Sequence, residues 1–570
     1  MKIWTFASMT LLLASQGLAQ PAIKSNGVVN ASGYQAKLAP DTVFVIFGSG
    51  IGPATLAAVT APDYPASIGS TSVTFTPAAG GTAVTAKMVY AVAGQVAGLL
   101  PSSIAPGTYA VRVTYNNQVS APQNVTVVAR SFGIATANSG GTGTAQATVG
   151  NVNGGVSLTR FTTGSLAFNG LNWTLTPAHP GDSLVLWGTG GGADPANDTG
   201  GTSGDQTAAG NFIVNVGGRQ ITSLYAGASS GYPGLWQINF TLPAHITPDC
   251  FASLQVSAGG ELSNAVVIPI ADVGQSTCSA PGFDQATLSK LDAGGSIVFA
   301  GLSIGKINTT GSSFPAMGSG VIEQVGGVIN RYTAADWILP YSGPKFGPCS
   351  VFAVTYASGT TQPGNPSALL DAGAKLAFSG PNVLAGATVG AFVGPVGPAY
   401  SSTLPAGTLM EGGAYTLAGA GGTQVGPFIA TATLPSNFSV TNWSSISSIN
   451  RSTPLTINWT GAGFDQVLIL VQGATLGASN HNVAISCVVP ESLGTFSIPA
   501  AALAYLPAAA AGAAGNVGQL TVEATMAGAG TLSAQSSTAQ TLTPPLVGGG
   551  QADFGSFAPF LAVEKSVAIQ

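Results

Sequence analysis

The sequence predicts an all-β protein built from tandem Ig-like β-sandwich modules with at most a few short helices. The first observation is a repeat: residues 40–52, PDTVFVIFGSGIG, are matched by residues 180–192, PGDSLVLWGTGGG, with the leading proline, the aromatic residue before the turn and three glycines in register. The second is composition, because 79 glycines and only 6% charged residues leave few side chains that favour helix. The third is spacing, since apolar runs alternate with Gly, Pro and Asn, which is typical of strands.

The first 19 residues predict export. Lys2 precedes an apolar stretch from Ile3 to Ala14, and the small residues Gly17 and Ala19 stand where a signal peptidase cleaves. We expect residues 1–19 to be removed and the mature chain to be secreted, or held in the cell envelope of a bacterium. The apolar stretch is too short for a spanning helix, and no membrane span is expected in the mature chain.

Four β modules are expected after the signal peptide. Each has about the size of an Ig-like sandwich. They cover residues 20–130, 131–280, 281–435 and 436–570, the last with a C-terminal strand segment. The first two modules are the two copies of the repeat, because further positions correspond in order. These pairs are Tyr90 with Tyr225, Gln95 with Gln237, and Ser120 with Ser263.

The strands within these modules are read from apolar runs and period-two alternation. In the first module we expect strands at Val43–Phe47 and Tyr109–Tyr115, with turns at Pro106-Gly107 and Asn116-Asn117. The second module begins with a Gly- and Thr-rich stretch, residues 131–176. In the later modules the expected strands are Ser296–Ala300, Val351–Tyr356, Lys375–Phe378, Leu455–Trp459, Val467–Val471 and Val483–Val488.

Two further features are expected in the second half of the chain. Residues Asp284–Leu291 predict one short helix, with Asp284 as its N-cap. In the strand Leu455–Trp459 the alternate residues Leu455, Ile457 and Trp459 share one face, which we expect to be buried in a core.

The four cysteines, Cys250, Cys278, Cys349 and Cys487, favour disulfides in an exported protein. We expect Cys250 to pair with Cys278 around the last strands of the second module, which stabilises the fold by about 3 kcal/mol. Cys349 and Cys487 fall in different expected modules, so their pairing requires those modules to pack closely. Without a Cys-x-x-Cys motif, and with three histidines far apart in sequence, no metal site is predicted from these residues.

Three motifs suggest cofactor, catalytic or metal chemistry, and each is incomplete. The glycine turn after Val43–Phe47 resembles a dinucleotide-binding turn, but Pro53 stands where the third glycine is needed, so no cofactor is expected. Gly227–Gly231 has the spacing of a nucleophile elbow, yet Tyr232-Pro233-Gly234 follows instead of a helix, and His245 precedes Asp249, so no catalytic residue is expected.

The third motif is a Gly-rich loop with three carboxylates. Asp194, Asp198 and Asp205 could supply oxygen ligands to calcium, but they lack the alternating spacing of a calcium loop, and loop residues with turn preference are the favoured interpretation.

Charge excludes one class of partner. The formal net charge is −5, and the 15 Lys and Arg residues are scattered singly, whereas nucleic acid requires a concentrated basic surface. The remaining surface of hydroxyls, amides and small apolar groups suits contact with an extracellular glycan or protein.

Short motifs give the chain a resemblance to a known family. They are Leu38-Ala39-Pro40, Phe47-Gly48, Pro180-Gly181-Asp182, Gly234–Asn239 and Ser263-Asn264 in residues 29–278, with Phe346–Cys349, Leu370–Gly373 and Phe496–Pro499 in the remaining half. In these motifs the chain resembles the uncharacterised repeat domain of exported Solibacter-type acidobacterial proteins. The resemblance implies an Ig-like, IPT/TIG-like sandwich fold and export, and it brings no catalytic residues.

Two functional hypotheses remain open. The first is a non-enzymatic extracellular or cell-envelope protein whose modules act as a spacer, an adhesive surface or a carbohydrate-contacting scaffold. The second is a secreted hydrolase that uses carboxylates from distant strands, such as Asp182, Asp205 and Glu323. A deep pocket lined by two carboxylates would favour the hydrolase. Exposed aromatic residues, Tyr232 and Trp236 among the candidates, would favour glycan contact, although a core position is the favoured interpretation of Trp236.

Overall fold

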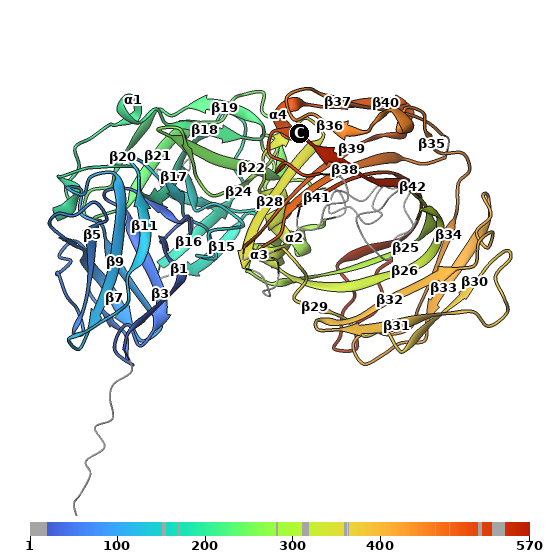
Figure 1. The fold of residues 1–570 in the computed structure, drawn as a ribbon, viewed down its shortest axis with the longest axis horizontal. Coiled ribbons are helices and arrows are strands. Elements are labelled where there is room, and N and C mark those ends of the chain that lie inside the picture. The colour runs from blue at the N-terminus through green and yellow to red at the C-terminus, as the bar shows by residue number, and fades with distance from the viewer. Residues whose placement is uncertain are drawn as a thin grey trace, which may run out of the picture.

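The computed structural model describes residues 20–150, 155–168, 171–280, 283–310, 319–357, 362, 364–461, 463–477, 479–510, 516–526 and 542–570. The expected signal peptide, residues 1–19, lies outside the described residues. Strands dominate the chain and form several sheets, with short helices between them (Figure 1). The predicted all-β class with tandem Ig-like sandwiches is confirmed.

The first sandwich consists of two sheets. One has the order β1 (Ala22–Asn30), β3 (Val43–Ser49), β8 (Gln95–Leu99), β7 (Lys87–Val92) and β4 (Ala57–Ala58). The other has the order β2 (Lys37–Leu38), β11 (Gln123–Val127), β9 (Gly107–Tyr115), β5 (Thr71–Pro77) and β6 (Val84–Thr85), with β10 (Gln118–Val119) paired to β9. Phe44 and Phe75 meet edge-to-face between the sheets, with ring centroids 5.2 Å apart. Asn116 and Asn117 both have positive φ, as a tight turn between β9 and β10 requires.

The second sandwich repeats this plan with additions. Its larger sheet has the order β15 (Gly164–Phe168), β16 (Leu171–Thr176), β14 (Val156–Thr159), β13 (Ala147–Gly150), β17 (Ser183–Thr189), β21 (Trp236–Thr241) and β20 (Tyr225–Ala228), with β12 (Gly133–Ile134) paired to β17. The other sheet contains β19 (Arg219–Thr222), β18 (Ile213–Val216), β22 (Asp249–Ala258) and β23 (Glu261–Leu262), with β24 (Val266–Ile270) paired to β22. The stretch 131–176 therefore contains five strands rather than a simple connection, because its small β-branched residues fit a sheet as well as a loop.

The glycine turns of the repeat lead into no long helix. After Gly52 the next element is β4, and after Gly192 come the 3-10 helix η1 (Asn197–Thr199) and the single-turn helix α1 (Thr207–Gly210). Ser120 and Ser263 also occupy equivalent places. Each hydroxyl accepts a hydrogen bond from a backbone N–H seven residues earlier, at 3.0 Å and 2.9 Å, and donates to the carbonyl of the next residue. The two copies of the repeat thus share local hydrogen bonding as well as strand order.

The remaining chain is organised around one sheet of 14 strands. Its order is β27 (Lys345–Phe346), β28 (Cys349–Ala357), β39 (Ser479–Pro490), β38 (Gln466–Thr475), β41 (Asn516–Thr525), β42 (Phe554–Ser566), β25 (Ser296–Thr310), β26 (Gly320–Thr333), β32 (Gly397–Leu404), β31 (Thr388–Gly394), β30 (Lys375–Ser379), β33 (Ala414–Gly419) and β34 (Phe428–Thr433), with β29 (Ala368–Leu369) paired to β26. Two small sheets accompany it: β35 (Ser439–Val440), β37 (Leu455–Thr460) and β40 (Thr495–Ile498) form one, and β36 (Ser448–Ile449) and β43 (Ala568–Ile569) form the other.

This sheet crosses the module boundary expected at residue 435. Strand β25 pairs in parallel with β42, and β28 pairs with β39, so residues 281–435 and 436–570 share one hydrogen-bonded sheet. The two ranges are therefore not separate sandwiches. The physical reason is that alternation along a strand identifies the residues that face a core but not the strand that lies beside it.

Helices are short and sit between strands. They are α2 (Gln285–Asp292), α3 (Ala334–Ile338), α4 (Ala500–Leu503) and the 3-10 helices η2 (Leu339–Tyr341), η3 (Trp443–Ser445) and η4 (Glu491–Leu493). The expected helix is α2, and Asp284 caps it by accepting a hydrogen bond from the Thr287 N–H at 2.8 Å. Ile457 and Trp459 of β37 are buried as expected, whereas Leu455 at the start of the strand is half-buried against the same core.

Both expected disulfides are present in the structure. Cys250 of β22 pairs with Cys278, and Cys349 pairs with Cys487. The second pair joins directly opposite residues of the neighbouring strands β28 and β39, which explains how cysteines 138 positions apart meet.

An aromatic cluster joins the second sandwich to the large sheet. Trp337 of α3 is buried at its centre and contacts the rings of Phe554 at 4.8 Å and Tyr332 at 5.3 Å between centroids. Phe251 of β22 stacks on Tyr341 of η2 at 4.6 Å. Because these rings come from both sides of the joint, they hold the two parts in a fixed relation.

Candidate binding site

A cleft lies where the second sandwich meets the large sheet. Its floor is the outer face of β18, β19, β22 and β23, and its volume is about 300 Å³, at the lower end of the range for small-molecule sites. The strands of the floor alternate. Val214, Val216 and Leu254 are buried in the core of the sandwich, so the residues between them, such as Asn215, face outward.

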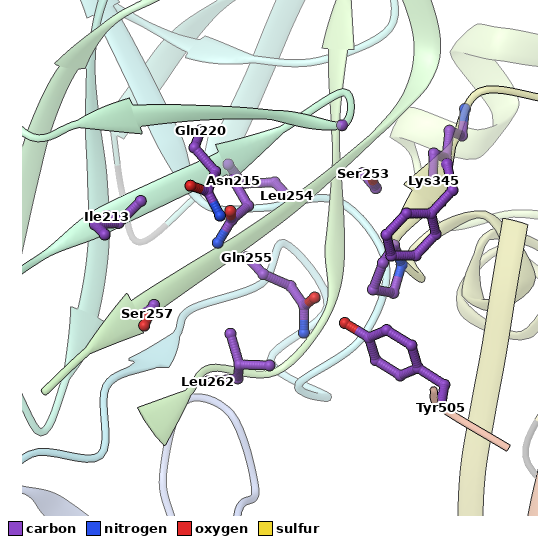
Figure 2. Close-up of a pocket in the computed structure, with 13 residues that line it drawn as sticks. Ile213, Asn215, Gln220, Ser253, Leu254, Gln255, Ser257, Leu262, Lys345 and Tyr505 are labelled. Carbon is purple, nitrogen blue, oxygen red and sulfur yellow. The ribbon is translucent and has the colours of Figure 1, made fainter. Parts of the chain in front are cut away.

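A row of three amides crosses the floor. Asn215 of β18 lies directly opposite Gln220 of β19 on one side and opposite Gln255 of β22 on the other. All three line the cleft and project from neighbouring strands (Figure 2). Gln255 donates from Nε2 to the Ser263 carbonyl at 3.2 Å, while the amides of Asn215 and Gln220 have no hydrogen bond among the described residues. The row therefore offers both donors and acceptors to a ligand.

The wall of the cleft comes from the other side of the joint. It consists of Pro344, Lys345 and Phe346, the last two in β27, and of Tyr505, which follows α4. The rings of Phe346 and Tyr505 are tilted by 57° with centroids 6.0 Å apart. Tyr505 is 36% exposed, and its hydroxyl points toward the side of the cleft that carries Gln255 (Figure 2).

Contacts beside the cleft hold the wall against the floor. Lys345 forms an ion pair with Asp249 at the start of β22. The backbone carbonyl of Lys345 lies 3.2 Å from where a Cβ on Gly218 would stand, so the turn after β18 approaches the wall closely. The Cys250–Cys278 disulfide ties the next residue of β22 to the end of the second sandwich. These contacts fix the spacing between the amide row and the aromatic wall.

The chemistry of the lining is polar but largely uncharged. Lys345 is the one charged residue among the thirteen that line the cleft, and its ammonium is paired with Asp249. None of the described residues that line the cleft is a carboxylate, the group that supplies both acid and base in glycoside hydrolysis. Amides, serines and two aromatic rings can bind a neutral ligand with hydroxyl groups and an apolar face.

The carboxylates considered for hydrolysis lie on separate elements and have local partners. Asp182, before β17, accepts the His179 N–H at 2.8 Å. Asp205 accepts hydrogen bonds from the Thr207 hydroxyl at 2.5 Å and from the Thr207 N–H at 2.9 Å, and these bonds lower the pKa of Asp205. Glu323 of β26 accepts from two backbone N–H groups, those of residues 407 and 409, at 3.0 Å and 2.8 Å. Asp182 and Asp205 thus stabilise their own loops, and Glu323 ties β26 to the loop that follows β32.

The carboxylates considered for calcium are likewise hydrogen-bonded to protein groups. Asp194 accepts from Ser203 N–H and Oγ, the latter at 2.5 Å, and Asp198 accepts from Ser102 Oγ at 2.7 Å. Within the described part of the chain, no group of three or more His, Cys, Asp or Glu side chains could hold a metal ion.

The serine motif at residues 227–231 forms a loop, and of the two aromatic residues that follow it one is exposed and the other is buried. Residues 227–231 begin at the end of β20 and continue as a loop. Ser229, the middle residue of the motif, bonds through its backbone to the Leu235 carbonyl at 2.7 Å and to Asn197 Nδ2 at 3.1 Å, and among the described residues no histidine bonds to it. Tyr232 is 59% exposed, whereas Trp236 is fully buried, as expected for a core residue.

Trp236 takes part in a second joint, between the first and second sandwiches. Its Nε1 donates to Oδ2 of Asp41 at 2.9 Å, and no donor among the described residues reaches Oδ1 of Asp41. Burial raises the pKa of Asp41 from 3.8 to about 8. The hydrogen bond from Trp236 and the charge of Lys87 lower it, and Asp198 and Asp194 raise it. The carboxyl is therefore largely protonated at neutral pH.

Sequence patterns do not point to the cleft floor. Asn215, Gln220 and Gln255 are ordinary outward residues of alternating strands, and nothing local predicts that they form one row. Tyr505 follows an Ala-rich stretch that carries no motif. The three amides become neighbours only because β18 pairs with both β19 and β22.

Comparisons with known proteins give no family. No family model and no curated protein matches the chain. Among solved structures, SGBP-B from a complex xyloglucan utilization locus in Bacteroides uniformis has a TM-score of 0.15 and 11% identity, covering 82% of this chain and 99% of that one. The SGBP-B of the Bacteroides ovatus mixed-linkage glucan utilization locus, in complex with a mixed-linkage heptasaccharide, has a TM-score of 0.13 and 13% identity, covering 82% and 87%.

A third solved structure, the FN1–FN3 domains of chicken CNTN1, has a TM-score of 0.12 and 9% identity, covering 70% of this chain and 93% of that one. At these TM-scores the similarities carry no argument about function, which is drawn below from the residues of this chain. Among the described residues, no helix is long and apolar enough to cross a membrane.

Proposed function

We propose that this chain is an exported, non-enzymatic, multi-module β-sandwich protein of the bacterial surface or envelope that binds a neutral glycan in the cleft between its second sandwich and its large sheet. The observation that carries the proposal is the lining of the cleft: a row of three amides faces an aromatic wall, without a carboxylate among the lining residues. Sugar hydroxyls exchange hydrogen bonds with amides, and the apolar face of a sugar ring packs on an aromatic ring.

Two further features support export and a binding role. The four cysteines form two disulfides, a state that persists in oxidising compartments outside the cytoplasm. The cleft lies at a joint between rigid units, where binding sites of multi-module proteins are common. In this function the repeated modules act as a scaffold, and the ligand binds at the joint between the second sandwich and the large sheet.

The test is binding of the mature protein to a panel of neutral polysaccharides, namely β-glucan, xylan and mannan, by affinity gel electrophoresis. We expect retardation by at least one of them, with Tyr505→Leu and Gln255→Ala each weakening binding roughly tenfold, since each removes about 1.4 kcal/mol of ligand contact. Tyr232→Leu is the matched control, because it removes an exposed aromatic ring outside the cleft lining. Binding unaffected by both cleft variants would refute the cleft as the site.

A secreted hydrolase is distinguished in the same experiment. Release of reducing sugar from the polysaccharide that binds, abolished by Asp182→Asn, Asp205→Asn or Glu323→Gln, would replace the binding proposal with the hydrolase hypothesis. We expect none of these variants to change polysaccharide binding, because each carboxylate accepts hydrogen bonds from backbone N–H groups of the protein.

A further inference from the structure

Three corresponding positions of the sequence repeat face outward rather than into the core. In the first copy they are Phe47 on β3, Gln95 on β8 and Tyr90 on β7, and in the second copy Trp187 on β17, Gln237 on β21 and Tyr225 on β20. All six are partly exposed. Their inward neighbours, such as Ile46 and Leu186, are fully buried in the two sandwich cores.

The register places these residues identically in the two copies. Phe47 lies directly opposite Gln95, and Tyr90 lies opposite the residue two positions after that glutamine. In the second copy Trp187 lies opposite Gln237, and Tyr225 again lies opposite the residue two positions later. Each copy therefore presents an aromatic ring, an amide and a phenol on three adjacent strands. We name these sets the first platform (Phe47, Gln95, Tyr90) and the second platform (Trp187, Gln237, Tyr225).

In the first platform the polar groups are already arranged. Gln95 donates from Nε2 to the Tyr90 hydroxyl at 2.7 Å, which holds the amide beside the phenol. The ring of Phe47 lies nearly parallel to that of Tyr34, with centroids 6.1 Å apart and an interplanar angle of 18°. Together with Tyr90 these rings cover the buried Val45, so the surface is a layer of aromatic rings over an aliphatic base.

Beside the second platform, one amide oxygen has no donor among the described residues. Trp187 is oriented by a hydrogen bond from Nε1 to the Thr148 hydroxyl at 3.3 Å. Asn239, which lies opposite Tyr225 on the same outward face, has a buried Oδ1 that no donor among the described residues reaches. A buried acceptor without a donor costs about 1–3 kcal/mol, and this cost falls directly beside Tyr225.

The needs of folding explain why the two copies of the repeat share some residues, but they do not explain the shared residues of the two platforms. Ser120 and Ser263 are both buried, and each hydroxyl bonds to backbone groups that a strand end leaves free. Within the described part of the chain, the platform side chains form no hydrogen bond with a backbone group. Their rings do cover small apolar residues. An outward aliphatic residue would cover those equally well. What an aliphatic residue lacks is a flat ring face beside an amide and a phenol.

We propose that the two platforms are additional saccharide-binding surfaces, each of which takes a neutral sugar ring of a longer glycan. The ring face of Phe47 or Trp187 packs on the apolar face of the sugar, and the neighbouring amide and phenol exchange hydrogen bonds with its hydroxyls. A second copy of this chain is the less suitable occupant, because the polar groups of the platforms would be left poorly paired in an apolar dimer contact. The inference extends the proposed glycan binding to surfaces that do not depend on the cleft.

The test uses the mature full chain, the same β-glucan, xylan and mannan panel, and variants that keep the aliphatic cover but remove the ring face. Phe47→Leu combined with Trp187→Leu should weaken binding to the retained polysaccharide by roughly tenfold or more, since two binding surfaces on one chain reinforce each other. Phe47→Tyr combined with Trp187→Phe is the matched control and should bind nearly as wild type. Gln95→Ala combined with Gln237→Ala gives a second variant pair in case the leucine variants unfold, and thermal unfolding checks each protein.

Hydrogen exchange locates the contact. On addition of the polysaccharide, amides of β3, β8, β17 and β21 should become more protected in wild type and in Tyr505→Leu, but not in the double leucine variant. Protection of the cleft strands alone, with unchanged affinity of the double leucine variant, would overturn the platforms while leaving the cleft proposal standing. Platform protection that persists in Tyr505→Leu while the cleft strands show none would instead overturn the cleft. A concentration-dependent dimer that the double leucine variant abolishes, without any polysaccharide binding, would overturn the platforms in favour of self-association.

Discussion

Asp41 provides a sharp test of how the first two sandwiches are joined. Its carboxyl is fully buried, accepts one hydrogen bond from Trp236, and has a pKa raised from 3.8 to about 8 by burial. Between these values the folded protein keeps a proton that the unfolded chain releases, so stability falls as pH rises from about 4 to about 8 and is level above that. At about 1.4 kcal/mol per pH unit, the free energy of unfolding falls by about 5 kcal/mol between pH 4 and pH 8.

The perturbation is Asp41→Asn. Asparagine keeps the shape and the acceptor for Trp236, tolerates the positive φ of 62° at this position, and does not titrate. The variant should therefore lose the downward slope between pH 4 and 8 and gain stability relative to wild type as pH rises. Urea unfolding at half-unit pH steps measures the difference in free energy of unfolding between the variant and wild type. Hydrogen exchange in β3 and β21 shows which unfolding transition breaks the joint between the first two sandwiches.

The control is Asp205→Asn, for which we expect the opposite dependence of stability on pH. Hydrogen bonds from Thr207 lower the pKa of Asp205, so this carboxylate stabilises the fold above the unfolded pKa near 4, and its contribution is lost as pH falls below that value. Parallel pH profiles for wild type and Asp41→Asn would refute the assignment of a buried, protonated carboxyl to the joint.

The remaining predictions concern the joint between the second sandwich and the large sheet, and the two disulfides. Trp337→Ala should lower the free energy of unfolding by about 3–5 kcal/mol, because it empties the centre of an aromatic cluster shared by the second sandwich and the large sheet. Thermal and urea unfolding measure this, and a loss below about 1 kcal/mol would contradict the central position of the ring. Cys250→Ala with Cys278→Ala should cost about 3 kcal/mol, and Cys349→Ala with Cys487→Ala should cost more, since its disulfide closes a loop of 138 positions rather than 28. Equal unfolding midpoints for both double variants and wild type would count against a stabilising role for either bond.

Local patterns account for the features that the sequence predicts correctly. The apolar run Val43–Phe47, the capping aspartate Asp284 and the paired asparagines Asn116-Asn117 each act over a few residues. The strand β3, the helix α2 and the turn after β9 follow from them. The repeat adds a longer comparison that predicts two equivalent sandwiches.

Features that depend on pairing between distant strands could not be predicted in the same way. The boundary at residue 435 is an example, since nothing in β25 indicates that β42 lies beside it. The amide row is another, because Asn215, Gln220 and Gln255 become neighbours only when three strands pair in one register. Side-chain type specifies which face of a strand is buried, and non-local register decides which polar residues meet.

The parallel pairing of β25 with β42 has a consequence for how this half of the chain is assembled. The backbone N–H of Val298 donates to Asp553, 255 positions later, and β42 lies between β41 and β25 in the middle of the sheet rather than at its border. β42 follows every other strand of this sheet along the chain, so the facing edges of β41 and β25 stay unpaired until it has been synthesised. Contacts of such sequence separation form slowly, because a large loop has to close first. Until β42 pairs with them, the facing edges of β41 and β25 expose unpaired backbone to other chains, so this half of the chain is prone to aggregate while it folds.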